Sequence, residues 1–277
     1  GLLLFHARND AQTNRLSEIT AYGFYSLRGQ YGFLSDQAVY THREKWLLLG
    51  RVRLQYLPLY YFGIGNDSRE GDRISFGGSY ILVRERFLRG VAKNLFMGLD
   101  TDLQRLSRVR FPDTPLLNDD RMLGQAGGFN LGLGASVIYD SRRNYLNPRA
   151  AVFAELSLLA YRPAWGSRFN FTSYTADLRR FWKLTEKRVM AFQLFGTYAQ
   201  GEVPFNQLPM LGGESLMRGY YLGRFRDHAY FAAQAEHRWL PFGFSKRWGG
   251  AVFAALGNVA AAPSGLWKQP PRWAAGA

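Results

Sequence analysis

The side chains best suited to acid–base or metal chemistry are few and scattered along the chain. The four histidines are His6, His42, His228 and His237. None has a carboxylate at the spacing of a metal site, and Gly213-Glu-Ser215 lacks the second glycine of a nucleophile elbow. Asp100 and Asp102 share one face of a predicted strand, and the simplest interpretation is that they are polar residues facing the interior of a β-barrel. We therefore predict no catalytic residue, no metal and no cofactor, and an enzyme with its serine and histidine on adjacent strands stays a minor alternative.

The cysteine count and the net charge further narrow the classes of protein that this chain could belong to. The chain has no cysteine, which excludes a disulfide framework, thiol catalysis and a cysteine-based zinc site. The net charge is +14, with 29 arginines and 6 lysines. The arginines are spread along the whole chain and form no basic stripe, so we predict no nucleic-acid partner. Arginine-rich codon usage would give the same balance, and arginine also suits a polar lumen or lipid phosphates.

Composition indicates a folded chain without a membrane-spanning helix. Of the 277 residues, 47% are hydrophobic and 16% are aromatic, too many for a disordered chain. No run of about 18 apolar residues exists, so no helix is predicted to cross a bilayer. A chain can still be embedded in a membrane when apolar and polar residues alternate, as in a β-barrel with a wet interior.

Alternation with a period of two is the dominant pattern. It extends over residues 46–56, 95–104, 131–140, 190–198 and 231–239. We interpret these stretches as strands of about 9–13 residues, the length that crosses a bilayer at the tilt of a barrel. A soluble sandwich is the alternative, but strands in globular proteins are usually about 5–6 residues long.

Thirteen strands are predicted, at residues 1–8, 16–28, 30–41, 46–57, 74–88, 92–107, 128–141, 150–162, 168–182, 188–200, 228–240, 248–260 and from 272 onward. All eleven prolines fall between them, as expected for a residue that cannot donate to a ladder. The predicted fold is all-β, an antiparallel up-and-down transmembrane β-barrel forming one domain over residues 1–277.

The connections between these strands alternate in length. One set is mostly long, at residues 58–73, 108–127, 163–167 and 201–227. The other set is short, at residues 42–45, 89–92, 142–149, 183–187 and 241–247. Long extracellular loops and short periplasmic turns are typical of outer-membrane barrels, so we predict an integral protein of the bacterial outer membrane. Aromatic residues near strand ends, among them Trp46, Tyr56, Trp182 and Trp239, would form the interfacial girdles.

The most informative segment is Leu211-Gly-Gly-Glu-Ser-Leu-Met-Arg-Gly-Tyr220 in the longest loop. It resembles the conserved loop of the bacterial surface antigen superfamily, the BamA/TamA-like outer-membrane barrels. The resemblance implies that the tip, Arg218-Gly219-Tyr220, folds back into the lumen. It also implies that Glu236 on the next strand holds Arg218. The family usually has an aspartate as a second partner, where this chain has Ala255.

Elementary chemistry agrees with that arrangement. Gly212 and Gly213 let the loop turn sharply before its tip. An arginine in a partly dry lumen needs a carboxylate, and Glu236 lies on the polar phase of its strand. We therefore expect Arg218 within hydrogen-bonding reach of Glu236, a contact we term the loop lock. A solvated loop arginine is the alternative.

Two further segments are similar to the same family. The stretch 134–142 ends in Asp140 and Arg142 and is followed by Pro148, which would define a periplasmic turn. The stretch 61–68 carries Gly63, Gly65 and Asn66, a turn-forming signature of compact members without periplasmic domains. A phosphate-binding loop is a poor interpretation of this glycine pair, because no helix pattern follows it.

The resemblance implies a role in outer-membrane protein insertion, assembly or translocation. Expected partners are outer-membrane lipid, lipopolysaccharide and substrate outer-membrane proteins. A structural or passive pore barrel without insertase activity is the alternative, and an outer-membrane hydrolase is less favoured. Family members have about 16 strands, so the 13 readable strands predict that the first strand and the last strands are missing and that both edges of the wall are open.

Overall fold

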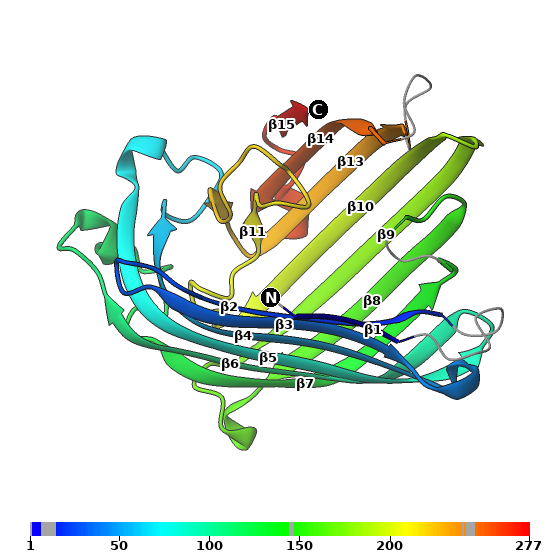
Figure 1. Ribbon diagram of the computed structural model, residues 1–277. Coiled ribbons are helices and arrows are strands. Elements are labelled where there is room, and N and C mark those ends of the chain that lie inside the picture. The colour runs from blue at the N-terminus through cyan, green and yellow to red at the C-terminus, as the bar shows by residue number, and fades with distance from the viewer. Residues whose placement is uncertain (1, 7–14, 144–146, 240, 242–246) are drawn as a thin grey trace.

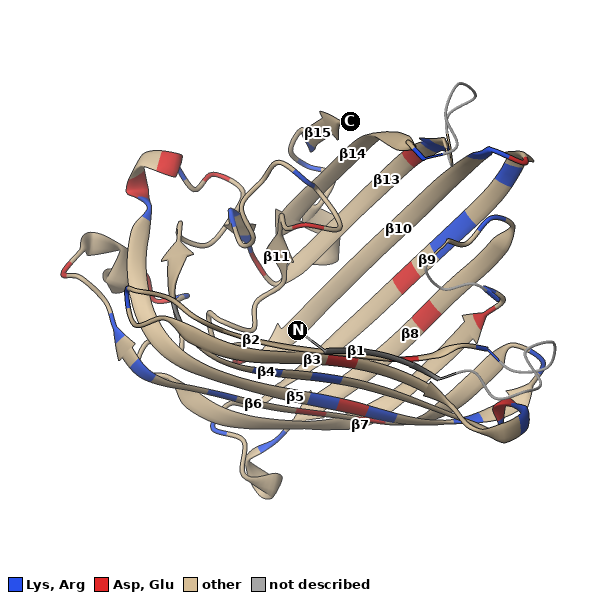
Figure 2. Cartoon of the chain, in the orientation of Figure 1, with Lys and Arg blue, Asp and Glu red and all other residues tan. Residues whose placement is uncertain are grey.

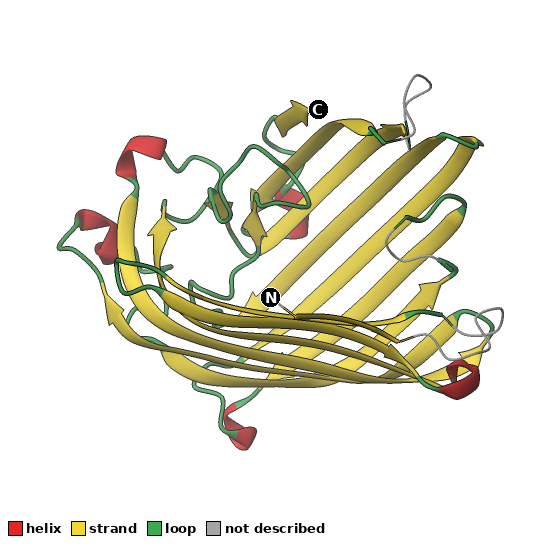
Figure 3. Ribbon diagram, viewed as in Figure 1, coloured by secondary structure: helices red, strands yellow, loops and turns green. Residues whose placement is uncertain are grey.

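The computed structural model describes residues 2–6, 15–143, 147–239, 241 and 247–277. Strands dominate it, and its helices are short 3-10 segments at the loops (Figure 3). The strands are β1 (Leu2–His6), β2 (Ser17–Tyr25), β3 (Tyr31–Tyr40), β4 (Trp46–Tyr61), β5 (Ile74–Ala92), β6 (Leu95–Arg110), β7 (Gly128–Asp140), β8 (Ala151–Tyr161), β9 (Phe171–Thr185), β10 (Arg188–Gly201), β11 (Met210–Leu211), β12 (Phe225–Arg226), β13 (Ala229–Trp239), β14 (Gly250–Ala260) and β15 (Arg272–Gly276). The 3-10 helices are η1 (His42–Glu44), η2 (Glu70–Asp72), η3 (Pro115–Asn118), η4 (Pro163–Trp165) and η5 (Pro263–Gly265).

Thirteen strands form one antiparallel sheet, in the order β1 to β10 and then β13, β14 and β15. Each strand pairs with its neighbour along the chain, so the topology is up-and-down. The sheet bends into a curved wall that encloses a lumen, with β1 and β15 at its two ends (Figure 1). The predicted all-β, antiparallel barrel fold is thereby confirmed.

Strand boundaries differ from the prediction by up to four residues at both ends of the wall, as at the ends of β4 and β5. β4 continues to Tyr61, so the expectation that every proline lies between strands is wrong at Pro58. β3 pairs with β4 only as far as Tyr31–Tyr56, so a missing N–H at Pro58 costs little on that side. The small sheet of β11 and β12 was not predicted either.

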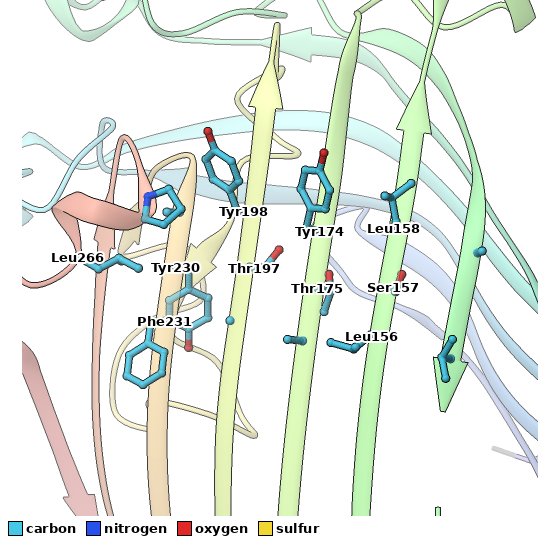
Figure 4. A pocket seen from close by; sticks show the side chains of 16 residues that line it. Leu156, Ser157, Leu158, Tyr174, Thr175, Thr197, Tyr198, Tyr230, Phe231 and Leu266 are labelled. Carbon is cyan, nitrogen blue, oxygen red and sulfur yellow. The ribbon is translucent and has the colours of Figure 1, made fainter. Parts of the chain in front are cut away.

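The two faces of the wall alternate residue by residue. Leu47 and Leu88 point into the lumen and are 1% and 0% exposed, whereas their neighbours Trp46 and Phe87 point outward and are 45% and 48% exposed. The outer face is apolar and aromatic. Figure 4 shows Tyr174 and Tyr198 side by side above a hollow of about 520 Å³ on this face. Such a face suits hydrocarbon.

The lumen face carries paired charges instead. Arginines of β5 pair with acidic residues of β6 and β8, and β9 carries an acidic residue and a basic residue close together (Figure 2). Arg84 reaches Asp100 at 2.6 Å, and the same carboxylate accepts from Ser136 and Ser157. A polar cavity of about 400 Å³ lies beside these pairs. Desolvated charges are tolerated here because each has a partner.

The long-loop end of the lumen is filled by an apolar cluster. Phe205, fully buried, packs edge-on against Tyr61 and Phe76 at 5.7 and 5.4 Å. Met122 and Leu208 belong to the same cluster. Loops from three places in the chain therefore meet over the lumen and position the segment described next. Among the described residues, no helix is long and apolar enough to span a membrane.

Candidate functional site in the inserted loop

The segment between β10 and β13, residues 202–228, folds into the lumen as a small hairpin (Figure 1). Its two short strands, β11 and β12, pair Met210 with Arg226 and Leu211 with Phe225. Gly212 has a positive φ of 109°, and a side chain there would collide with the Tyr221 carbonyl. The chain can make this tight turn because glycine tolerates both the backbone angle and the close approach.

The tip of this hairpin is tied to two strands of the wall. The Arg218 guanidinium donates to Glu236 on β13, and Glu236 is 8% exposed. Glu236 also accepts from Arg238 Nε at 2.6 Å. The Arg218 guanidinium lies over the Phe253 ring of β14, 3.6 Å from its centroid. A charge-assisted hydrogen bond and a cation–π contact thus fix one side chain.

Ala255 lies beside this tip, where the resemblance places a second carboxylate. It is 3% exposed and packs in an apolar cluster with Leu211 and Met217. Arg218 Nε has no hydrogen-bond partner among the described residues. The hairpin tip is therefore held by one carboxylate instead of two. The Phe253 ring and the buried apolar residues of the loop add to that contact.

The base of the hairpin is held by a buried cation. Arg226 is 3% exposed, donates to the Phe205 carbonyl at 3.0 Å and lies over the Tyr61 ring at 5.1 Å. Burial lowers the pKa of Arg226 to about 10. Its carbonyl accepts from Gly65 N at 2.8 Å. The hairpin base is thereby joined to the first long loop.

That first loop contains the glycine signature of residues 61–68. Gly63 and Gly65 adopt positive φ angles of 91° and 106°. Asn66 is buried and donates to Gln269 Oε1 at 2.7 Å. Arg224 of the hairpin donates to the Ser68 carbonyl at 3.0 Å. Two segments that the sequence presents separately therefore form one unit, together with the residues after β14.

Arg218, Gly219, Tyr220 and Glu236 come together at the hairpin tip, and Gly212 and Gly213 lie just below them. Gly219 has a positive φ of 103°, and its Cβ position faces open space. Tyr220 N donates to the Met217 carbonyl at 3.2 Å, which closes the turn. The role of these residues as a lock stays a prediction.

Asp140, Arg142 and Pro148 lie at the opposite end of the wall. Asp140 is 2% exposed and accepts from the backbone N and the Nε of Arg142 at 2.9 and 3.0 Å. Arg142 lies over the Phe153 ring at 4.3 Å. Pro148 is buried, whereas residues 144–146 of this turn lie outside the described residues. The role of these residues in defining a turn stays a prediction.

Three residues of the site were not singled out as site residues from the sequence: Phe253, Arg224 and Arg226. Phe253 is on the lumen phase of β14 opposite Glu236, and that register was the available signal. Arg224 and Arg226 follow the tip in an irregular segment that gives no periodic pattern. No group of three His, Asp or Glu side chains within the described residues is placed to hold a metal ion.

Comparison with known proteins identifies the family to which the chain belongs. The sequence profile of the Omp85 superfamily domain matches residues 25–271, and the chain belongs to that superfamily. No curated protein sequence matches the chain.

A solved structure shares the fold. It is BamA from Haemophilus ducreyi lacking POTRA domains 1–3, with a TM-score of 0.57 and 16% sequence identity. The match covers 87% of this chain and 52% of that chain, so the chain spans about half the length of that structure. At this identity the likeness concerns the fold alone.

Proposed function

We propose that this chain is an integral outer-membrane β-barrel that takes part in the insertion, assembly or translocation of outer-membrane proteins. Membership of the Omp85 superfamily supports the class. The observation that carries the proposal is the inserted hairpin with Arg218 held between Glu236 and Phe253. The proposed partners are substrate outer-membrane proteins and, at the outer face, membrane lipid including lipopolysaccharide.

The loop lock has a physical role in this proposal. The hairpin occupies the lumen next to β13 and β14, so it braces the wall near one end of the sheet. A substrate strand that adds to a sheet edge needs a wall whose register is fixed. The Arg218 contacts give that region a fixed partner inside the lumen.

A purified chain reconstituted in liposomes tests the proposal. We expect a urea-denatured outer-membrane β-barrel to fold into these liposomes several-fold faster than into empty ones. Arg218→Ala should remove most of that acceleration because the hairpin loses its charged anchor. Arg121→Ala is the matched control, since its guanidinium is 61% exposed and its ion pair within the described residues is with Asp119 of the same loop. Equal folding rates with and without the chain would contradict an assembly role.

A passive pore is the second candidate, favoured by the polar lumen cavity of about 400 Å³. Bilayer conductance separates the two. A lumen filled by the hairpin and the Phe205 cluster should give small, irregular conductance that rises in Arg218→Ala. A large, steady conductance that is the same in both proteins would favour the pore.

A further inference from the structure

A bulge near the long-loop end of β6 changes which face its last residues occupy. Below the bulge, even-numbered residues of β6 point into the lumen, as the burial of Phe96, Asp100 and Leu106 indicates. The register then moves from Ser79–Ser107 to Gly77–Arg110, so β6 has one residue more than β5 in this interval. Arg108 has a positive φ of 54° at this point. A bulge of this kind re-aims the side chains beyond it.

Because of the extra residue, Arg110 joins Arg105 and Ser107 on the outer face. Val109 and Phe111 pack against the lumen cluster, which confirms the inverted phase. An uninterrupted strand would have pointed Arg110 into the lumen. The bulge therefore gathers two arginines on the outer surface at the long-loop end of the wall.

The neighbouring strands complete a shallow site around these arginines. Gly77 lies beside Arg110 on β5, and Ser79 lies between Tyr56 and Ser107. A Cβ atom on Gly77 would be 3.5 Å from the Tyr56 hydroxyl and meet nothing else, so the surface is notched there. Ser79 Oγ is covered from solvent and has no hydrogen-bond partner among the described residues, so Ser79 forms the floor of the notch. Arg105 and Arg110 are exposed, and neither has an ion pair or hydrogen bond within the described part of the chain.

We propose that this outer-rim patch, formed by Tyr56, Gly77, Arg105 and Arg110, binds the phosphate groups of the glycolipid in the outer leaflet of the membrane. Two unpaired guanidinium groups and the Tyr56 hydroxyl complement a diphosphorylated sugar headgroup. Tyr56 stacks on Tyr31 at 5.7 Å, an aromatic pair of the kind found at headgroup level. The acyl chains would lie on the apolar face below. The inference rests on the proposed outer-membrane location and not on assembly activity.

Isothermal titration of the full chain in zwitterionic detergent with diphosphoryl lipid A tests the proposal. We expect Arg105→Gln/Arg110→Gln to weaken binding by about tenfold or more, because two charge-assisted contacts are lost. Gly77→Leu should weaken it as well by filling the notch without disturbing the fold. Arg89→Gln/Arg188→Gln is the matched control: it removes two outward arginines from the other end of the wall, and affinity should stay within about twofold.

Titration with a series of phosphate-containing ligands shows whether the patch prefers the glycolipid to other sources of phosphate. Monophosphoryl lipid A should bind more weakly than the diphosphoryl form. Unchanged affinity in Arg105→Gln/Arg110→Gln would overturn the proposal. Phosphatidylglycerol binding as tightly as diphosphoryl lipid A would overturn it too, as would displacement by millimolar inorganic phosphate. Titration uses no substrate protein, so failure here and failure of the assembly role are separate results.

Discussion

On the lumen face, Arg84, Arg86 and Arg179 each contact a carboxylate at 2.6 Å. On the outer face, Arg105 and Arg188 form no ion pair within the described residues. The same residue type thus faces two environments across one sheet. Inside, the protein must supply the countercharge because the lumen is partly dry. Outside, the headgroups of a membrane can supply it.

One polar pair on the outer face departs from this division. Gln37 of β3 donates to Glu85 of β5 at 3.0 Å, across Gly50 of β4. A side chain at Gly50 would collide with Gln37, so the glycine makes room for the contact. Gly50 lies between Trp46 and Tyr56 along β4, so the pair would face hydrocarbon in the proposed membrane position. Here the protein again supplies its own partner, as it does in the lumen.

The largest expected effect comes from breaking a lumen pair. Asp100→Ala would leave Arg84 without its carboxylate, and Asp100 is 0% exposed with Ser136 and Ser157 also bonded to it. We expect a loss of about 3–5 kcal/mol in the free energy of unfolding, because a desolvated charge loses its partner. Urea unfolding in lipid vesicles, followed by tryptophan fluorescence, measures it.

Arg51→Ala is the control for that change. Arg51 also pairs with a lumen carboxylate, Asp36, but their side chains are 61% and 45% exposed, and Asp36 keeps a second partner in Arg53. The expected loss is about 0–1 kcal/mol, since solvent screens such a pair. Equal losses in both variants would show that the lumen is uniformly wet and would remove the contrast between its dry and wet parts.

The strands of the wall were predictable because apolar and polar residues alternate along them, as expected for a strand with one face toward lipid and one toward the lumen. Residues 131–140 and 190–198 read as strands and form β7 and β10. The Arg218–Glu236 contact was expected because the loop resembles that of the surface antigen superfamily and a polar-phase glutamate follows it along the chain. These features depend on local pattern and on order, and the sequence carries both.

Other features depend on contacts with no local pattern. β11 and β12 have two residues each, too few for a period to appear. Arg224 contacts Ser68, which is 156 residues away in the sequence, and no pattern in either segment predicts that contact. The bulge at Arg108 shifts the phase by one residue among three arginines, where alternation of apolar and polar types has already ended. Tertiary packing decides such details.

A smaller effect is expected for the outer polar pair. Gln37→Leu would leave the Glu85 carboxyl without a hydrogen bond in hydrocarbon, at a cost of about 1–3 kcal/mol. Gln37→Leu/Glu85→Leu should recover that loss, because replacing both partners removes the unmet group. The same urea titration measures both. If the double variant is less stable than Gln37→Leu alone, the pair contributes something other than mutual satisfaction.

The smallest effect is expected for the unpaired outer arginines in the absence of their lipid. In detergent without glycolipid, Arg105→Gln/Arg110→Gln should change the free energy of unfolding by no more than about 0.5 kcal/mol, since no protein contact is lost. In vesicles containing diphosphoryl lipid A, the wild-type chain should gain stability that the double variant lacks, because a ligand that binds the folded state stabilises it. A large loss in plain detergent would mean that these arginines have a partner within the protein, and the contrast between the two faces would then fail at the outer-rim patch.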